Sequence, residues 1–136
     1  MTLHTLAISI HVVIAILGLG QVAGIAVVAT STSAQGASWG ALQRLARGMT
    51  WSLVIVLLSG VLVEYSLGGP FHEAWWFRLS FFGLLALGAI NGRMARALRK
   101  RGLIGDERTL KGVVRSAWIM CAITAVIAVL MAIKPF

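Results

Sequence analysis

The apolar positions of this chain fall into four long runs, separated by shorter and more polar segments. Residues 5–29, for example, contain no charged side chain. About 20 apolar residues are enough for a helix to cross a bilayer, and in lipid a helix satisfies its own backbone hydrogen bonds. The pattern therefore predicts an all-α fold, an integral membrane four-helix bundle that forms a single domain over residues 1–136. The predicted spans are residues 3–29, 50–67, 77–97 and 113–134.

The segment before the second span, residues 36–49, has a different pattern. Its apolar residues recur at helical spacing, and Arg44 and Arg47 fall elsewhere on the helical wheel. This pattern is typical of a short helix that lies on a membrane surface, and we expect it at the cytoplasmic interface. The apolar positions are Trp39, Leu42, Ala46 and Met49.

Composition agrees with a membrane location. Hydrophobic residues make up 59% of the chain and charged residues 12%, against about 25% charged residues in a typical soluble domain. The net charge of +8 comes from basic residues between the spans, so it indicates topology and not nucleic-acid binding. Arg44 and Arg47 lie in the first connection. The third connection and its helix ends hold Arg93, Arg96, Arg99, Lys100, Arg101, Arg108, Lys111 and Arg115.

The positive-inside rule makes the basic connections cytoplasmic. Both termini and the loop at residues 68–76 then lie on the outer, periplasmic side of a bacterial inner membrane. The basic third connection is expected to lie close to anionic lipid. Trp75 and Trp76, at the outer end of the third span, are expected to form part of an interfacial aromatic belt.

Small residues predict where helices meet, because helices in lipid associate through close packing. The small-residue faces of this chain predict either a compact four-helix bundle or contact faces for other subunits. Gly20 and Gly24 have GxxxG spacing in the first span, and Gly88 and Gly92 have it in the third. Gln21, Ser59 and Asn91 are expected to form hydrogen bonds between helices. A stripe of small residues in the fourth span is also expected at a helix contact, and it consists of Ala117, Cys121, Ala125, Ala128 and Ala132.

The scarce ionisable residues gather in the outer half of the predicted bundle. His4 and His11 lie seven residues apart, on nearly the same face of the first helix. Glu64 ends the second span, and His72 lies in the outer loop. Ionisable groups inside a membrane often mark a ligand site, a relay or a pathway. Imidazole binds zinc, copper and iron, and it can also be an axial ligand of haem.

These residues leave two interpretations of the outer cluster open. In one, His11 together with His4, Glu64 or His72 binds a metal ion or a haem. In the other, a hydrogen bond between His11 and Glu64 holds the bundle together.

The chain resembles small bacterial four-span membrane proteins, the group near the copper-resistance D domain and the DUF2269 families. The resemblance rests on "LHTLAISIH", "LGLGQVAG", "RLARGMTWSLVIVLLSGVLVEY", "RLSFFGLLALGAINGRMARALRK" and the ending "MAIKP". It covers most of the chain. It implies a four-helix bundle of the inner membrane, with copper or haem handling as the associated activity.

Three functions follow from the sequence. The first is an accessory or structural subunit of a membrane assembly, with other membrane subunits or further copies of the chain as partners. The second is a metal- or haem-binding membrane protein that uses the outer cluster. The third is a proton or ion pathway through Glu64 and His11. The sequence contains no paired-carboxylate, nucleophile-elbow, phosphate-loop or CxxC pattern, so it does not predict an enzyme.

Overall fold

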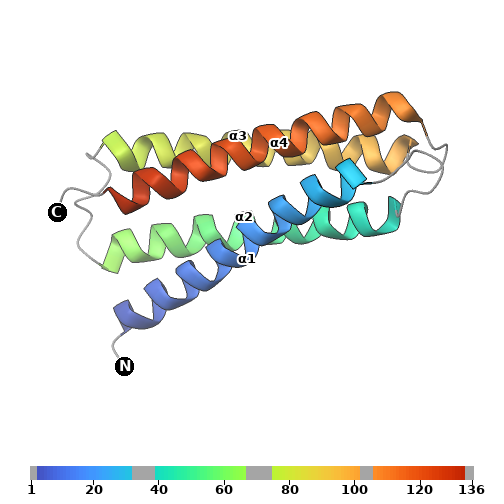
Figure 1. The fold of residues 1–136 in the computed structure, drawn as a ribbon. Helices are drawn as coiled ribbons and strands as arrows, with labels where there is room; N and C mark the ends of the chain where they lie inside the picture. The colour runs from blue at the N-terminus through green and yellow to red at the C-terminus, as the bar shows by residue number, and fades with distance from the viewer. Residues whose placement is uncertain (1–2, 32–38, 67–74, 102–105, 134–136) are drawn as a thin grey trace.

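A computed structural model describes residues 3–31, 39–66, 75–101 and 106–133, and these residues form four α-helices (Figure 1). In chain order the helices are α1 (Leu3–Ser31), α2 (Trp39–Ser66), α3 (Trp75–Arg101) and α4 (Glu107–Ala132). The all-α fold and a helix at each of the four predicted places are confirmed.

The four helices run alternately up and down. The contacting pairs are α1 with α2, α2 with α3, α3 with α4 and α4 with α1. The start of α1 and the end of α4 lie at one end of the bundle (Figure 1). The end of α1, the start of α2, the end of α3 and the start of α4 lie at the other. The described lysines and arginines other than Arg78 gather at this second end, called the basic end below. They belong to the start of α2, the end of α3 and the start of α4.

The predicted interfacial helix is not separate from the second span. From Trp39 onwards its residues form the first part of α2, which continues without a break to Ser66. Residues 36–38 lie outside the described part. Leu42, Ala46 and Met49 are buried in the bundle, so the apolar stripe faces the other helices and not a membrane surface. The prediction was wrong because an amphipathic stripe has the same spacing whether it covers a bilayer or a bundle core.

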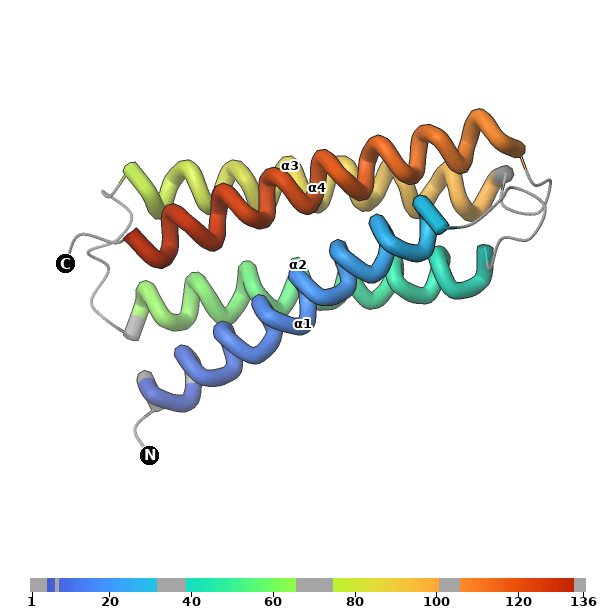
Figure 2. Tube along the Cα trace, in the orientation of Figure 1, coloured from blue at the N-terminus to red at the C-terminus, as the bar shows by residue number. Residues whose placement is uncertain are grey.

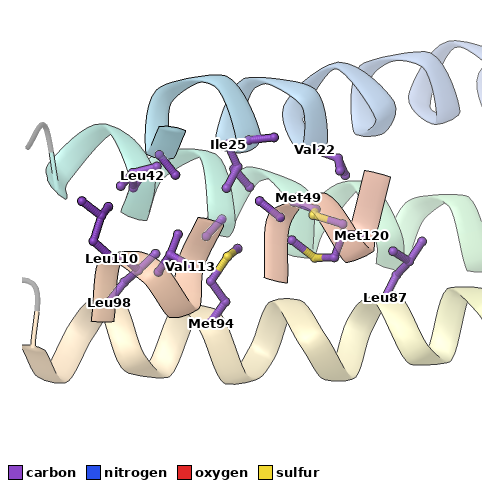
Figure 3. Packing of buried hydrophobic residues seen from close by; sticks show 14 residues of the cluster. Val22, Ile25, Leu42, Met49, Leu87, Met94, Leu98, Leu110, Val113 and Met120 are labelled. Atoms are coloured by element: carbon purple, nitrogen blue, oxygen red, sulfur yellow. The ribbon is translucent and has the colours of Figure 1, made fainter. Parts of the chain in front are cut away.

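The hydrophobic core occupies the half of the bundle next to the basic end (Figure 3). It takes residues from 22–29 of α1, 42–49 of α2, 87–98 of α3 and 110–120 of α4. The larger members, such as Ile25, Leu98 and Met120, are fully buried. In this half all four helices contribute to one cluster.

The other half, towards the termini, is packed differently. Its buried residues in the described part are Val56, Trp76 and the small polar Ser59 and Ser80. The N-terminal part of α1 also diverges from α3 and α4 (Figures 1 and 2). This outer half therefore has much less apolar packing between its helices than the basic half.

The two tryptophans of the expected aromatic belt lie in different environments. Trp75 has an exposed fraction of 65%, whereas Trp76 is buried at 6%. The prediction was wrong for Trp76 because adjacent residues on a helix point about 100° apart, so only one of the two can face outwards here.

The GxxxG pair of the third helix does not mediate a helix contact. A Cβ atom built at Gly88 or Gly92 meets no atom within 4 Å, so both glycines face open space. In the first helix, a Cβ atom built at Gly24 would lie 3.8 Å from Leu45, an ordinary contact distance, and one built at Gly20 would meet no atom within 4 Å. The face that α3 does bury has the helical spacing of Leu87, Asn91, Met94 and Leu98.

The small-residue stripe of α4 is buried at one end only. Ala117 is buried and Cys121 is half-buried against the core, as predicted for a helix contact. Ala125, Ala128 and Ala132 are exposed, so this part of the stripe is not a contact within the bundle. That it contacts other subunits stays a prediction. The buried part of the stripe ends close to Met120, the last residue of α4 in the buried core.

Three of the described helices are long and apolar enough to cross a membrane, over Ile8–Ser31, Trp39–Tyr65 and Glu107–Ala132. The helix at the predicted third span, α3, is not among them. Arg78, Asn91, Arg93 and Arg96 reduce its apolar character.

The helices α3 and α4 approach each other closely at Gly83. A substitution at this position therefore tests how the two helices pack. A Cβ atom at Gly83 would lie 2.8 Å from Ile127 Cδ1. We expect Gly83→Leu to lower the free energy of unfolding by about 1–3 kcal/mol, the usual cost of overpacking. The matched control is Gly88→Leu, on the same helix, where the added side chain meets open space and stability should not fall. Equal stability of both variants, measured by unfolding in mixed detergent micelles, would contradict the contact.

Candidate functional site

The candidate site lies where the outer halves of α1 and α2 meet. His11 Nδ1 of α1 is 2.9 Å from Ser59 Oγ of α2. Next to it, Gly60 leaves room for the imidazole ring, since a Cβ atom there would lie 3.5 Å from His11 Cε1. Ser59 is buried and His11 is half-buried. His11 therefore lies in a helix contact, with one ring nitrogen bonded across it.

The second hydrogen bond of Ser59 determines which atom carries the shared proton. The Ser59 hydroxyl donates to the carbonyl oxygen of Val56 at 3.1 Å. A hydroxyl has a single proton, so in the bond to His11 the serine oxygen accepts and Nδ1–H donates. Hydrogen-bond partners of this kind orient histidines that bind metals.

The remaining predicted site residues are only partly placed. Glu64 is half-buried in α2, four residues beyond Gly60 and on the same side of that helix. His4 belongs to α1, but its side chain lies outside the described part, as does all of His72. The predicted hydrogen bond between His11 and Glu64 stays a prediction. Among the described residues there is no group of three or more metal-ligating side chains.

A second polar contact joins the same two helices nearer the basic end. Ser52 Oγ donates to Gln21 Oε1 at 3.2 Å. Glycines again provide the space, because a Cβ atom at Gly48 would lie 3.1 Å from Gln21 Nε2, and one at Gly18 would lie 3.4 Å from Ser52 Cβ. The prediction that Gln21 bonds between helices is confirmed. The structure pairs a polar side chain with an opposing glycine at two levels of the α1–α2 contact.

Asn91 of α3 bonds to the opposite side of α2. Its Nδ2 donates to the carbonyl oxygen of Ala46 at 3.0 Å and to Thr50 Oγ1 at 2.9 Å. Within the described part its buried Oδ1 atom has no hydrogen-bond partner. Ser59 and Asn91 thus also form the interhelical hydrogen bonds predicted for them.

The glycines of the α1–α2 contact were missed in the sequence. The GxxxG spacing drew attention to other glycines, whereas Gly18, Gly48 and Gly60 are not spaced by four. A usable signal was present, since His11, Gly18 and Gln21 follow in one order on α1 and their partners follow in the reverse order on α2. This is the order that an antiparallel helix pair requires.

No protein-family model, curated protein or solved structure matches the chain significantly. The resemblance to the copper-resistance D and DUF2269 groups therefore stays a prediction.

The His11–Ser59 bond can be measured by a double-mutant cycle of His11→Phe and Ser59→Ala. Phenylalanine keeps a ring beside Gly60 but cannot donate the hydrogen bond. We expect a coupling free energy of about 0.6 kcal/mol, and no more than about 1.7 kcal/mol, as found for such bonds between membrane helices. The measurement is unfolding in mixed micelles. The pair His11→Phe and Ser52→Ala is the control, because these residues do not contact each other, and it should show additive effects.

Proposed function

We propose that this chain is a small integral membrane protein that acts as an accessory or structural subunit of a larger membrane assembly. The observation that carries the proposal is the surface of the N-terminal half of α1. Between residues 5 and 20 no described side chain of α1 is buried, and only His11, Ile14 and Gly18 are half-buried. These three lie at helical spacing, so one narrow stripe packs on the bundle and the rest of an apolar helix is left uncovered.

The membrane location is supported by an apolar surface on every described helix. Large apolar side chains are exposed on each, with exposed fractions of 63% at Ile16, 64% at Leu58, 64% at Phe82 and 56% at Val126. Exposed apolar surface of this extent is rare on monomeric soluble proteins and typical of membrane or protein contacts. Hydroxyl groups on this surface bond within their own helices, as Thr124 Oγ1 does to Met120 O at 2.7 Å.

The charge distribution supports the orientation in this proposal. The described cations gather at the basic end, so that end faces the cytoplasm by the positive-inside rule. Both termini then face outwards, and α3 crosses the membrane as part of the bundle. The basic end lies next to the anionic lipids of the inner leaflet.

The uncovered part of α1 is the surface that we expect other membrane subunits to cover. The alternative partners are a second copy of the chain and a different protein. Lipid alone could also cover it, and lipid therefore has to be distinguished from protein by experiment.

The test is photocrosslinking in native membranes washed at alkaline pH. A benzophenone amino acid replaces Ile16 in α1, and in the matched control it replaces Val126 in α4, which is similarly exposed. We expect a discrete protein adduct from position 16 and none from position 126, because α4 faces lipid there. An adduct of twice the 14.5 kDa chain mass would identify a second copy as the partner.

Two results would contradict this proposal in different ways. Loss of the chain during the alkaline wash would overturn the membrane location. Retention of the chain without a protein adduct from position 16 would overturn the subunit role and leave the membrane location in place.

Metal or haem binding is the second candidate, and the hydrogen bond between His11 and Ser59 favours it. The bond between Nδ1 and Ser59 Oγ at 2.9 Å is the kind of supporting hydrogen bond that orients ligating histidines. The described residues fit a group that needs one histidine ligand from this chain, such as haem, better than a small ion held by several of its side chains. The proton or ion pathway through Glu64 and His11 stays a prediction.

Absorption spectra of the protein in mild detergent, oxidised and reduced, test this candidate together with elemental metal analysis. We expect a bound chromophore or stoichiometric metal in the wild type and its loss in His11→Ala. Ser59→Ala should weaken binding roughly 10- to 100-fold, the usual effect of losing such a supporting hydrogen bond. A metal-free, featureless spectrum from protein never exposed to a chelator would overturn the candidate.

A further inference from the structure

A groove between α3 and α4 at the basic end has the chemistry of an anion site. Its volume is about 420 Å³. Among the described residues that line it, four are cationic and none is acidic. Arg93, Arg96 and Lys100 come from α3 and Arg108 comes from α4. The lining thus carries four positive charges from two helices.

Helical spacing brings these charges together. Arg93, Arg96 and Lys100 are three and four residues apart, so they share one face of α3. Arg96 is also held along this face, since its Nε donates to Gly92 O at 3.2 Å. Like charges at this spacing repel one another, and an anion bound among them would relieve the repulsion.

The nearby acidic residues have other partners. Asp106 caps α4, accepting from the backbone N–H of Arg108 and from Thr109 Oγ1, each at 3.1 Å. Glu107 pairs with Lys111 at 2.9 Å, and neither residue lines the groove. The groove therefore keeps its positive charge although two acids lie close by in the sequence.

The wall on α4 leaves space for a ligand. Gly112 and Ser116 are small residues on the same face of α4 as Arg108, and both line the groove. A Cβ atom at Gly112 would meet no atom within 4 Å. A larger side chain at this position would fill the groove without colliding with the protein.

The surroundings of the groove distinguish a lipid from a small free anion. Apolar residues, Met94 and Val113, also line it. Ile119 is exposed and lies seven residues beyond Gly112, on the same side of α4 and towards the middle of the bundle. The surface of α4 therefore changes from cationic to apolar along the helix. A phospholipid needs this arrangement, because its headgroup is anionic and its acyl chains are apolar.

We propose that this groove binds the phosphate headgroup of an anionic phospholipid, with the acyl chains directed along α4 towards the middle of the bundle. The inference rests on the proposed membrane location, and it adds a defined lipid site to the general attraction between basic protein ends and anionic membranes.

The experiment titrates the full chain in neutral detergent with dioctanoyl phosphatidylglycerol and counts bound lipids by native mass spectrometry. Dioctanoyl phosphatidylcholine is the zwitterionic control. Arg93→Gln/Arg96→Gln removes two charges of the groove, and Gly112→Leu fills it without changing the charge. The matched control, Arg44→Gln/Arg47→Gln, removes two charges from α2 at the same end, and neither of these residues lines the groove.

We expect saturable binding of phosphatidylglycerol to the wild type and to the α2 control. Binding should weaken by about tenfold or more in the α3 variant, since each charge near anionic lipid contributes substantially. Gly112→Leu should weaken binding to a similar extent. The α2 control should stay within about twofold of the wild type.

Several outcomes would overturn the proposal. Equal weakening in the α2 and α3 variants would show non-specific attraction, and equal binding of the zwitterionic lipid would show that charge is not recognised. Displacement of the lipid by millimolar inorganic phosphate, or by a poly-glutamate peptide, would assign the groove to a free anion or to an acidic protein segment. The titration needs no membrane, so its result is independent of whether the chain is retained in washed membranes.

Discussion

The antiparallel contact between α1 and α2 is the constraint on which the rest of the fold depends. A polar side chain of one helix lies opposite a glycine of the other at two levels, His11 at Gly60 and Gln21 at Gly48. Each polar group is also bonded across the contact, to Ser59 and Ser52 respectively. A polar group left unpaired in an apolar environment is costly. A change of register would separate these pairs, so the hydrogen bonds determine how the two helices align, while apolar packing alone would allow several alignments.

This contact explains the difference between the two halves of the bundle. The alignment of α1 and α2 brings residues 22–29 and 42–49 together, and α3 and α4 complete the core there. Towards the termini, the described contacts between helices include the bond of His11 to Ser59 and the close approach at Gly83. All the described cations except Arg78 lie at the well-packed end. The large apolar cluster there holds the helix ends together against the repulsion between like charges. The outer half carries the half-buried imidazole and the least covered helix surface, which is where a partner or a ligand could still be added.

The sequence was sufficient to predict the four helices, their order and the gathering of charge at one end, because long apolar runs and the positions of Lys and Arg determine these features. Polar residues within apolar runs were also informative, and Gln21, Ser59 and Asn91 bond between helices as predicted. Which face of each helix is buried in the bundle was harder to predict. The first helix is apolar on nearly all sides, so its pattern does not distinguish the buried face, and the stripe from Leu42 to Met49 suits a membrane surface as well as a core. Gly88 and Gly92 do not form a helix contact within the bundle. Their spacing shows that the two glycines share one face of α3, but it does not show whether that face is covered by another helix.

The third helix shows how these constraints act together. It is the least apolar of the described helices, and its second half contains Asn91, Arg93 and Arg96. Asn91 would be costly in lipid, but both protons of its amide are bonded to α2, at Ala46 O and Thr50 Oγ1. The arginines lie near the basic end, where long side chains can reach the membrane surface. In the proposed membrane orientation, packing against α2 therefore offsets the cost of placing Asn91 within the membrane. The hydrogen bonds of this one asparagine connect α3 to the same helix that α1 contacts.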